Sequence, residues 1–111
     1  MRSGNLNKIE EELKDTDILI NCTSIGMEGE QENRTLISWE MLTPNTVVMD
    51  VIYTPLKTKL LKEAEDAGCK TVDGTSMFIH QASPSFKIWT GKSPPLEAMR
   101  RALLTHLRGV R

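Results

Sequence analysis

Small polar residues follow directly on a short apolar run near the beginning of the chain. Residues 17–27 read DILINCTSIGM, in which 18–20 predict a buried strand and Thr23 and Ser24 place hydroxyl groups in the loop that follows. Ligands of parallel sheets bind in the crevice outside the carboxyl ends of the strands. This pattern therefore indicates a site for a nucleotide or a small metabolite.

Three residues farther along the chain could belong to the same site. Tyr53 comes just after the apolar run 46–51, where its hydroxyl can donate to a ligand or its ring can simply pack at a strand–helix corner. Gly74 would let backbone approach a planar ligand closely, and an ordinary turn glycine is the alternative. The Gln81 amide could bridge two hydroxyls of a polyol, unless it is only a surface residue.

Helical and strand-like patterns alternate along the chain. The order is typical of an α/β protein, with a short parallel sheet of about three strands and right-handed crossovers. Because the strand 46–51 is apolar on both faces, we expect helices on both sides of the sheet, which makes three layers. The expected helices are 7–14, a turn at 38–42, 54–68, 74–91 and one after 93–95, and the expected strands are 17–21, 46–51 and 69–72.

Three local signals predict helix ends and a break. Ser38 is expected to cap the short helical turn that follows it, and Thr54 with Pro55 is expected to open a helix, as N-cap and first helical residue. Pro84 falls inside a helical pattern, where it removes a hydrogen bond and clashes with the preceding turn. A kinked helix is favoured over a new helix that Ser83 would cap.

Length and composition narrow the class of protein. The chain has 111 residues and a net charge of −1, so we expect one domain and neither nucleic acid nor an anionic membrane as partner. No apolar run is long enough for a membrane span, and no signal peptide precedes the first helix, which predicts a cytoplasmic protein. Cys22 and Cys69 lack metal-ligand spacing and are expected to be small buried residues, so no metal site is predicted.

Three segments carry a resemblance to a known family. DILINCTSIGM at 17–27, VMDVIYTPLKTKLL at 48–61 and DGTSMFIHQASPSFKIWTG at 73–91 resemble, in order and spacing, the C-terminal portion of shikimate dehydrogenase. The resemblance implies a half-Rossmann fold over residues 1–111, a single partial NADP-binding domain with flanking helices and two C-terminal helices. It also implies NADP-dependent interconversion of 3-dehydroshikimate and shikimate in aromatic amino-acid biosynthesis.

The resemblance assigns cofactor-binding roles to five residues. Thr23 and Ser24 match the loop beside the nicotinamide half of NADP. Val51 and Gly74 match positions whose backbone meets the nicotinamide amide, and Met77 matches a side chain that packs near that ring. The family often has a second glycine where this chain has a serine, two residues after Gly74.

The resemblance assigns substrate-binding roles to Tyr53 and Gln81, which match residues that reach the carboxylate and hydroxyls of shikimate. The catalytic lysine of the family, its aspartate partner and the glycine-rich turn for the pyrophosphate belong to segments that do not occur in these 111 residues. No catalytic residue is therefore assigned, and we expect the isolated chain to lack activity.

Two other functions remain open, and a partner is expected. The chain could be a non-catalytic module that binds a metabolite or a partner, or part of a dehydrogenase for quinate, since Tyr53 and Gln81 do not separate shikimate from quinate. Its strands would correspond to strands 4-5-6 of the family's sheet, which leaves the strand 17–21 at an open edge. Such an edge predicts a homodimer or higher oligomer.

Overall fold

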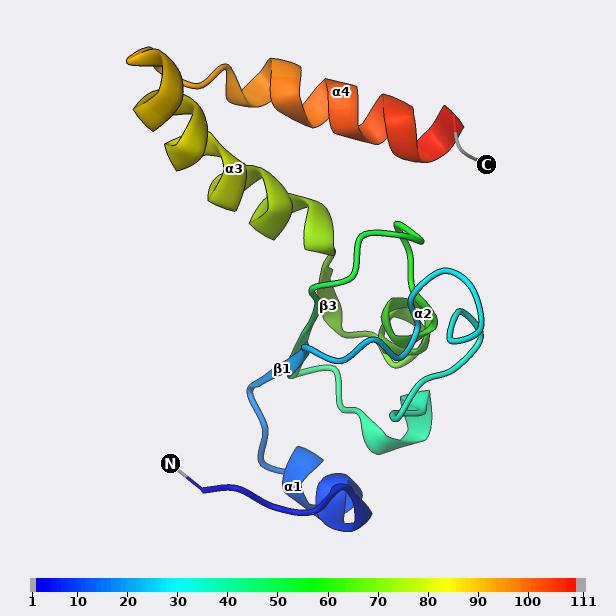
Figure 1. Cartoon of the computed structure of the whole chain (residues 1–111). Coiled ribbons are helices and arrows are strands. Elements are labelled where there is room, and N and C mark those ends of the chain that lie inside the picture. The colour runs from blue at the N-terminus through cyan, green and yellow to red at the C-terminus, as the bar shows by residue number, and fades with distance from the viewer. Residues whose placement is uncertain (1, 110–111) are drawn as a thin grey trace.

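A computed structural model of the protein describes residues 2–109 (Figure 1). Its elements, in chain order, are the 3-10 helix η1 (Leu6–Lys8), α1 (Ile9–Leu13), β1 (Ile18–Asn21), the 3-10 helix η2 (Trp39–Met41), β2 (Val47–Asp50), α2 (Lys59–Asp66), β3 (Lys70–Val72), α3 (Gly74–Thr90) and α4 (Leu96–Gly109). The predicted alternation of helices and strands is confirmed.

The three strands form one parallel sheet in the order β1-β2-β3. Leu19 lies beside Val48, and Val48 lies beside Thr71, so consecutive strands pair without a gap in the order. The α/β class and the three-stranded parallel sheet are confirmed. β1 lies at one edge of the sheet, as its correspondence to the fourth Rossmann strand predicted.

One face of the sheet holds the hydrophobic core. Val48 is fully buried there and packs with apolar side chains of α1 and α2, among them Leu13, Leu60 and Ala64. On the other face Ile18 is 63% exposed and Ile20 is 49% exposed. No described helix covers that face, so the third layer that we expected is absent among residues 2–109.

The helix after β2 begins four residues later than predicted. Thr54 and Pro55 are joined by a cis peptide bond and lie ahead of the helix. The N-cap is Thr58, whose hydroxyl oxygen accepts from the Leu61 N–H at 3.3 Å. That hydroxyl also donates to the buried Asp50 at 2.8 Å, and this tertiary bond fixes where α2 starts. The prediction of a Thr54-Pro55 helix start is therefore wrong.

Of the two remaining local predictions, the side-chain cap at Ser38 is wrong, whereas the favoured single helix through Pro84 is confirmed. Ser38 stands at the N-cap position of η2, but its side chain makes no capping hydrogen bond. The Trp39 N–H donates to the Glu63 carboxylate at 2.8 Å. Helix α3 continues through Pro84 as one element, so no new helix starts at Ser83. It ends at Gly91, whose φ of 69° suits a residue without a Cβ.

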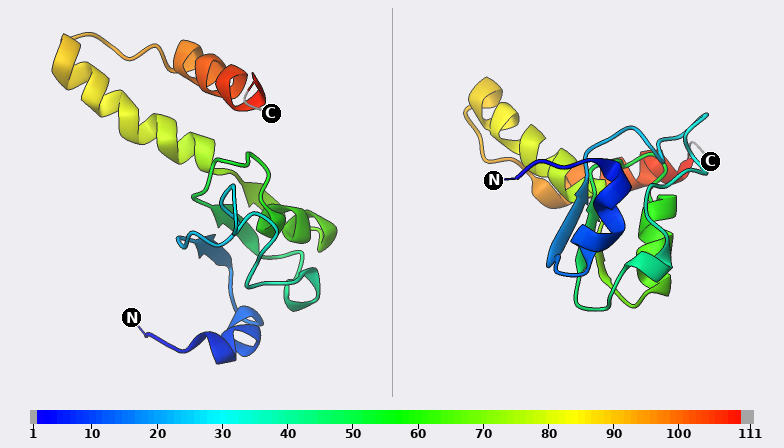
Figure 2. Two further views of the ribbon diagram at one scale, coloured as in Figure 1. Left: turned by 45° about the vertical axis from the view of Figure 1, so that its right-hand side comes forward. Right: turned by 90° about the horizontal axis from the view of Figure 1, so that it is seen from below.

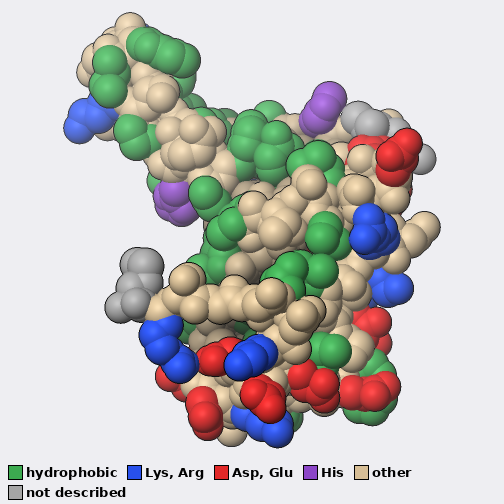
Figure 3. Space-filling model, turned by 60° about the horizontal axis from the view of Figure 1, so that its bottom comes forward, with side chains coloured by type: hydrophobic (Ala, Val, Ile, Leu, Met, Phe, Trp, Pro, Cys, Tyr) green, Lys and Arg blue, Asp and Glu red, His purple; other side chains and the backbone are tan. Residues whose placement is uncertain are grey.

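Helices α3 and α4 project from the sheet as an antiparallel pair (Figure 2). The two predicted C-terminal helices are thus confirmed. Ile88 is 80% exposed and Trp89 is 82% exposed near their junction, and no residue of α4 is buried. Figure 3 shows hydrophobic side chains on this projecting end, whereas charged side chains gather over the opposite end of the molecule.

The chain exposes more surface than a globular protein of its mass. Its accessible area is 7925 Å², whereas a folded monomer of 12.5 kDa exposes about 6,200 Å². Its radius of gyration is 16.0 Å, compared with about 13 Å for a typical domain of this length. The excess area comes from the open sheet face and from the projecting helices.

Residues 2–109 contain no helix that combines the length and the apolar content needed to cross a membrane. The same residues bring together no group of histidine, cysteine, aspartate or glutamate side chains that could hold a metal ion.

Gly74 fixes the start of α3 against the segment that follows β2. A Cβ built on Gly74 would lie 2.4 Å from the Val51 carbonyl oxygen and 2.6 Å from the Ile52 carbonyl oxygen. We expect Gly74→Ala to lower the free energy of unfolding by about 3 kcal/mol, since only backbone could move to relieve the overlap. Urea denaturation measures this change. Gly4→Ala is the control, because nothing lies within 4 Å of its Cβ position; equal effects of the two substitutions would contradict the packing described.

The open face and edge of the sheet generate a second prediction. The excess of about 1,700 Å² over a compact monomer is close to the area that a standard protein interface buries. We therefore expect the chain alone to self-associate through Ile18 and Ile20, and Ile20→Lys to shift the equilibrium toward monomer. Sedimentation velocity at tens of micromolar measures this, an order-of-magnitude range for such interfaces. Lys14→Ala, on the charged side, is the control, and a monomeric wild type would contradict the prediction.

Candidate functional site

A cavity of about 400 Å³ lies at the carboxyl ends of β1 and β2. It opens between the loop after β1 and the loop after β2. Its lining consists of Cys22, Thr23, Ser24, Met27, Val51, Ile52, Tyr53 and Thr54. Four of the residues that the sequence singled out, namely Thr23, Ser24, Val51 and Tyr53, are therefore brought together at one place.

The loop after β1 is ordered by hydrogen bonds to one side chain. The Asn21 amide oxygen accepts from the Thr23 N–H at 3.1 Å and from the Thr23 hydroxyl at 2.6 Å. The Thr23 hydroxyl in turn accepts from the Ile25 N–H at 3.2 Å. Ser24 has no such bond from its hydroxyl within the described chain, so this group remains available to a ligand.

The loop after β2 is held by a buried carboxylate. Asp50 ends β2 and is fully buried, and it accepts from the Ile52 N–H at 3.1 Å, from the Thr58 hydroxyl at 2.8 Å and from the Asn21 amide at 3.2 Å. The same Asn21 nitrogen also donates to the Ile25 carbonyl at 3.1 Å. One polar network therefore joins the ends of both strands to the start of α2.

Tyr53 lies against the first turns of α3. Its ring centroid is 4.7 Å from that of Phe78, with the two planes tilted by 53°. The Tyr53 hydroxyl has no hydrogen-bond partner within residues 2–109, so the ring is anchored while its polar end stays free. Both alternatives from the sequence are thus combined, because the side chain packs at a corner and still presents a donor.

Gly74 uses its missing side chain for packing within the protein. The close approach is to the backbone of residues 51–52, which leaves no room for a Cβ. The sequence suggested an approach to a planar ligand or a simple turn; the structure shows tight contact between the start of α3 and the cavity loop. Gly74 therefore sets the distance between α3 and Val51.

Met77 and Gln81 lie on α3 and are not part of the cavity lining. Met77 is 51% exposed, and Gln81 is also exposed. Gln81 follows Phe78 by three positions, which places it on the same face of the helix one turn farther along. Among the described residues, the cavity lining therefore does not include these two predicted site residues.

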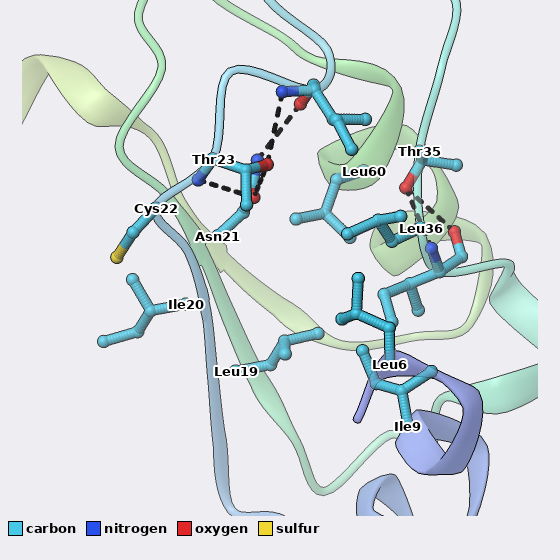
Figure 4. Close-up of a pocket in the computed structure, with 12 residues that line it drawn as sticks. Leu6, Ile9, Leu19, Ile20, Asn21, Cys22, Thr23, Thr35, Leu36 and Leu60 are labelled. Carbon is cyan, nitrogen blue, oxygen red and sulfur yellow. Dashed lines mark hydrogen bonds between the residues drawn. The ribbon is translucent and has the colours of Figure 1, made fainter. Parts of the chain in front are cut away.

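A second, smaller cavity of about 140 Å³ lies on the other side of the β1 loop (Figure 4). Leu6, Leu19 and Leu60 point into it, and Asn21 and Thr23 stand at its edge. Because its walls are mostly apolar and its polar groups are already bonded to one another, this space suits packing better than chemistry.

The two cysteines lie in different environments. Cys22 is exposed and lines both cavities, so the prediction that it is buried is wrong; its place in the loop after the strand explains this. Cys69 is buried, as predicted, and its thiol donates to the Thr43 carbonyl at 3.1 Å. Burial raises the pKa of the Cys69 thiol above its usual value, because the thiolate would lose its hydration.

The larger cavity is electrically neutral. None of its lining residues carries a charge, and the hydroxyls of Thr23, Ser24, Tyr53 and Thr54 are its polar groups. The nearby N-terminus of α3 is capped by Asp73, which accepts from the Thr75 N–H at 3.0 Å. An uncharged group with polar substituents therefore suits the lining, whereas a phosphate would find no cation there.

Sequence reasoning missed the residues that hold the site together. Asn21, Asp50 and Thr58 were not singled out, although Asn21 and Asp50 end β1 and β2 and Thr58 caps α2. One signal was available: an aspartate within the apolar run of residues 46–51 requires buried partners. The identity of those partners depends on the strand register and could not be found from spacing.

Comparisons with known proteins agree with this geometry. Residues 74–104 match the family described as Shikimate 5'-dehydrogenase C-terminal domain. The NADP(+) shikimate dehydrogenase of Alkaliphilus metalliredigens is 43% identical over 99 residues, which are 89% of this chain and 35% of the relative. The chain thus spans little more than a third of the length of the curated relatives that it matches.

Solved structures extend the likeness to the fold. A shikimate dehydrogenase in complex with NADP+ superimposes with a TM-score of 0.83 at 41% identity, over 89% of this chain and 34% of that one. The quinate dehydrogenase of Corynebacterium glutamicum in complex with NAD gives a TM-score of 0.82 at 38% identity, over 90% and 35%. The chain therefore corresponds to the C-terminal portion of NADP-dependent shikimate dehydrogenases and contains their C-terminal domain segment.

Proposed function

We propose that this chain supplies the nicotinamide side and part of the substrate side of an NADP-dependent shikimate dehydrogenase. The observation that carries the proposal is the neutral cavity between the ends of β1 and β2, where Thr23, Ser24, Val51 and Tyr53 meet. The reaction is the interconversion of 3-dehydroshikimate and shikimate. As a protein of amino-acid biosynthesis, it is proposed to act in the cytoplasm.

The residues present fit one half of NADP. NADP supplies or takes up a hydride when bound. The uncharged cavity lining suits the nicotinamide ring and its carboxamide, and Val51 is one of the lining residues. The pyrophosphate and the 2′-phosphate find no cationic lining there, so segments other than this chain's cavity must hold them.

The substrate side is proposed to involve α3 and the β2 loop together. Tyr53 presents an unpaired hydroxyl, and Gln81 presents an amide on the same side of α3 as Phe78. A hydroxyl and an amide suit the carboxylate and hydroxyls of a polyol acid. The similarity to a quinate dehydrogenase favours quinate as a second candidate substrate, since quinate offers the same groups.

The lining of this cavity contains no lysine, histidine, aspartate or glutamate that could act as a general acid or base. Hydride transfer to a carbonyl needs a proton donor within about 2.6–3.2 Å of the oxygen that is reduced. We therefore propose that the chain alone binds and orients but does not turn over substrate. Incubation of the 111-residue chain with NADP and shikimate is expected to produce no reduced cofactor.

Ligand protection of Cys22 tests the site in the chain alone. Because Cys22 lines the cavity and is exposed, iodoacetamide should modify it readily. Nicotinamide mononucleotide, which carries only the half of NADP that fits, is expected to slow that modification at least threefold at saturation. Adenosine 2′,5′-bisphosphate, which carries the other half, is expected to leave the rate unchanged. Mass spectrometry of the alkylated peptide measures both rates.

Cys69 serves as the internal control of this experiment. Its raised pKa and burial keep the thiol protonated and covered, so modification should require unfolding. Protection of Cys22 by the adenosine compound, or by neither compound, would contradict the assignment of the cavity to nicotinamide.

A chimeric enzyme tests the proposed substrate role of Tyr53. The N-terminal portion of the Alkaliphilus metalliredigens relative, joined ahead of residue 5, is expected to restore NADP-dependent oxidation of shikimate. In that chimera Tyr53→Phe should raise the KM for shikimate about tenfold, since one hydrogen bond to the substrate is lost, with the KM for NADP changed less than twofold. Thr105→Val, on exposed α4, is the control. An active chimera with an unchanged KM in Tyr53→Phe would refute the role.

A further inference from the structure

The two loops that line the neutral cavity are joined at both of its ends. At the strand ends, the Val51 N–H donates to the Asn21 carbonyl at 3.2 Å. At the far end, the Glu28 N–H donates to the Thr54 carbonyl at 2.8 Å. The shape of the cavity between these points therefore depends on what holds the strand ends in register.

Side chains supply that connection. The Asn21 amide spans both loops, because its nitrogen donates to Asp50 at 3.2 Å and to the Ile25 carbonyl at 3.1 Å, while its oxygen accepts from Thr23. Asp50 is fully buried and receives two more donors from its own loop, and no buried polar side-chain atom among the described residues lacks a partner. The bonds to Asp50 favour one geometry, because losing a donor would leave this buried carboxylate with an unsatisfied oxygen.

The network also fixes the polarity of the Thr23 hydroxyl. A hydroxyl has one proton, and that of Thr23 is donated to the Asn21 oxygen at 2.6 Å. One lone pair accepts from the Ile25 N–H at 3.2 Å. What remains for a ligand in the cavity is a lone pair, which matches an N–H or O–H donor and repels an anionic oxygen.

We propose that Asn21 and Asp50 are positioning residues that hold the two cavity loops together and leave the Thr23 hydroxyl able only to accept a hydrogen bond from the ligand. The ligand group that Thr23 meets is then a neutral donor, such as an amide or a sugar hydroxyl, and not a phosphate oxygen. The part of this inference that concerns the ligand rests on the proposed nicotinamide site; the part that concerns the loops does not.

Amide hydrogen exchange of the 111-residue chain tests the loops without a ligand. In Asn21→Leu, exchange at the Ile25 and Ile52 amides is expected to rise at least tenfold, while the Val48 amide in the centre of the sheet keeps its protection. Asn7→Leu is the matched control, because Asn7 is exposed in η1 and its side chain makes no hydrogen bond within residues 2–109. Unchanged exchange at both loop amides in Asn21→Leu would overturn the proposal.

A second variant keeps the test decisive if Asn21→Leu fails to fold. Asn21→Asp retains an oxygen that accepts from Thr23 but offers no donor to Asp50. It is expected to preserve protection at Thr23 and to lose it at Ile52. Wild-type protection at Ile52 in this variant would also overturn the proposal.

Affinity for nicotinamide mononucleotide tests the polarity of Thr23. Thr23→Val removes the accepting oxygen and is expected to weaken binding about tenfold, whereas Thr23→Ser restores the oxygen and should bind within twofold of wild type. Equal affinity of the valine variant and wild type would overturn the acceptor role. If wild type binds no mononucleotide, the proposed function fails, and the exchange rates still decide whether the loops are held as described.

Discussion

The buried carboxylate of Asp50 is the constraint on which the arrangement of this chain depends. It ends the central strand, is fully buried, and receives donors from the end of β1, from its own loop and from the N-cap residue of α2. A buried acidic group is tolerated only when it is fully hydrogen-bonded. Asp50 therefore fixes the positions of its three donors. Those donors in turn fix the Asn21 loop, the Ile52 turn and the start of α2.

This constraint explains how a small core can support a defined cavity. The apolar core lies on one face of the sheet, and the side chains that contribute to it come from α1, α2 and the strands. The cavity loops lie beyond the strand ends, where little apolar packing is available. Three other contacts hold these loops in place of apolar packing. They are the hydrogen bonds to Asp50, the contact of Tyr53 with Phe78 and the close fit of Gly74 on residues 51–52.

The sequence predicted the positions of the elements better than it predicted their boundaries. Thr23 and Tyr53 could be placed at one rim because parallel strands end on the same side of a sheet. Thr54-Pro55 was misassigned because both residues suit a helix start by local preference, whereas Thr58 is selected by its bond to Asp50, a residue eight positions away across the strand end. Local propensity contains no information about that bond.

The open face of the sheet has a similar explanation. The prediction of helices on both sides of the sheet rested on the strand 46–51, which is apolar on both faces. The pattern records that a surface needs covering, but it does not say which polypeptide covers it. Among residues 2–109 only one side is covered, and the chain spans about a third of the length of its relatives.

The neutral cavity and the open surfaces together suggest which steps of binding and catalysis this chain supplies in the proposed enzyme and which come from other segments. A site without charge can orient a nicotinamide ring and a polyol, but it contributes little binding energy to the phosphates and no proton to the carbonyl. Affinity for the whole cofactor and the proton transfer must therefore come from groups that face this cavity from elsewhere. Such groups act only when they are held at a fixed distance from the cavity. Asp50 and Asn21 fix the two cavity loops, so the segment that carries those groups must also be docked in one position. The exposed apolar face of the sheet and the projecting helices α3 and α4 offer the area for such docking.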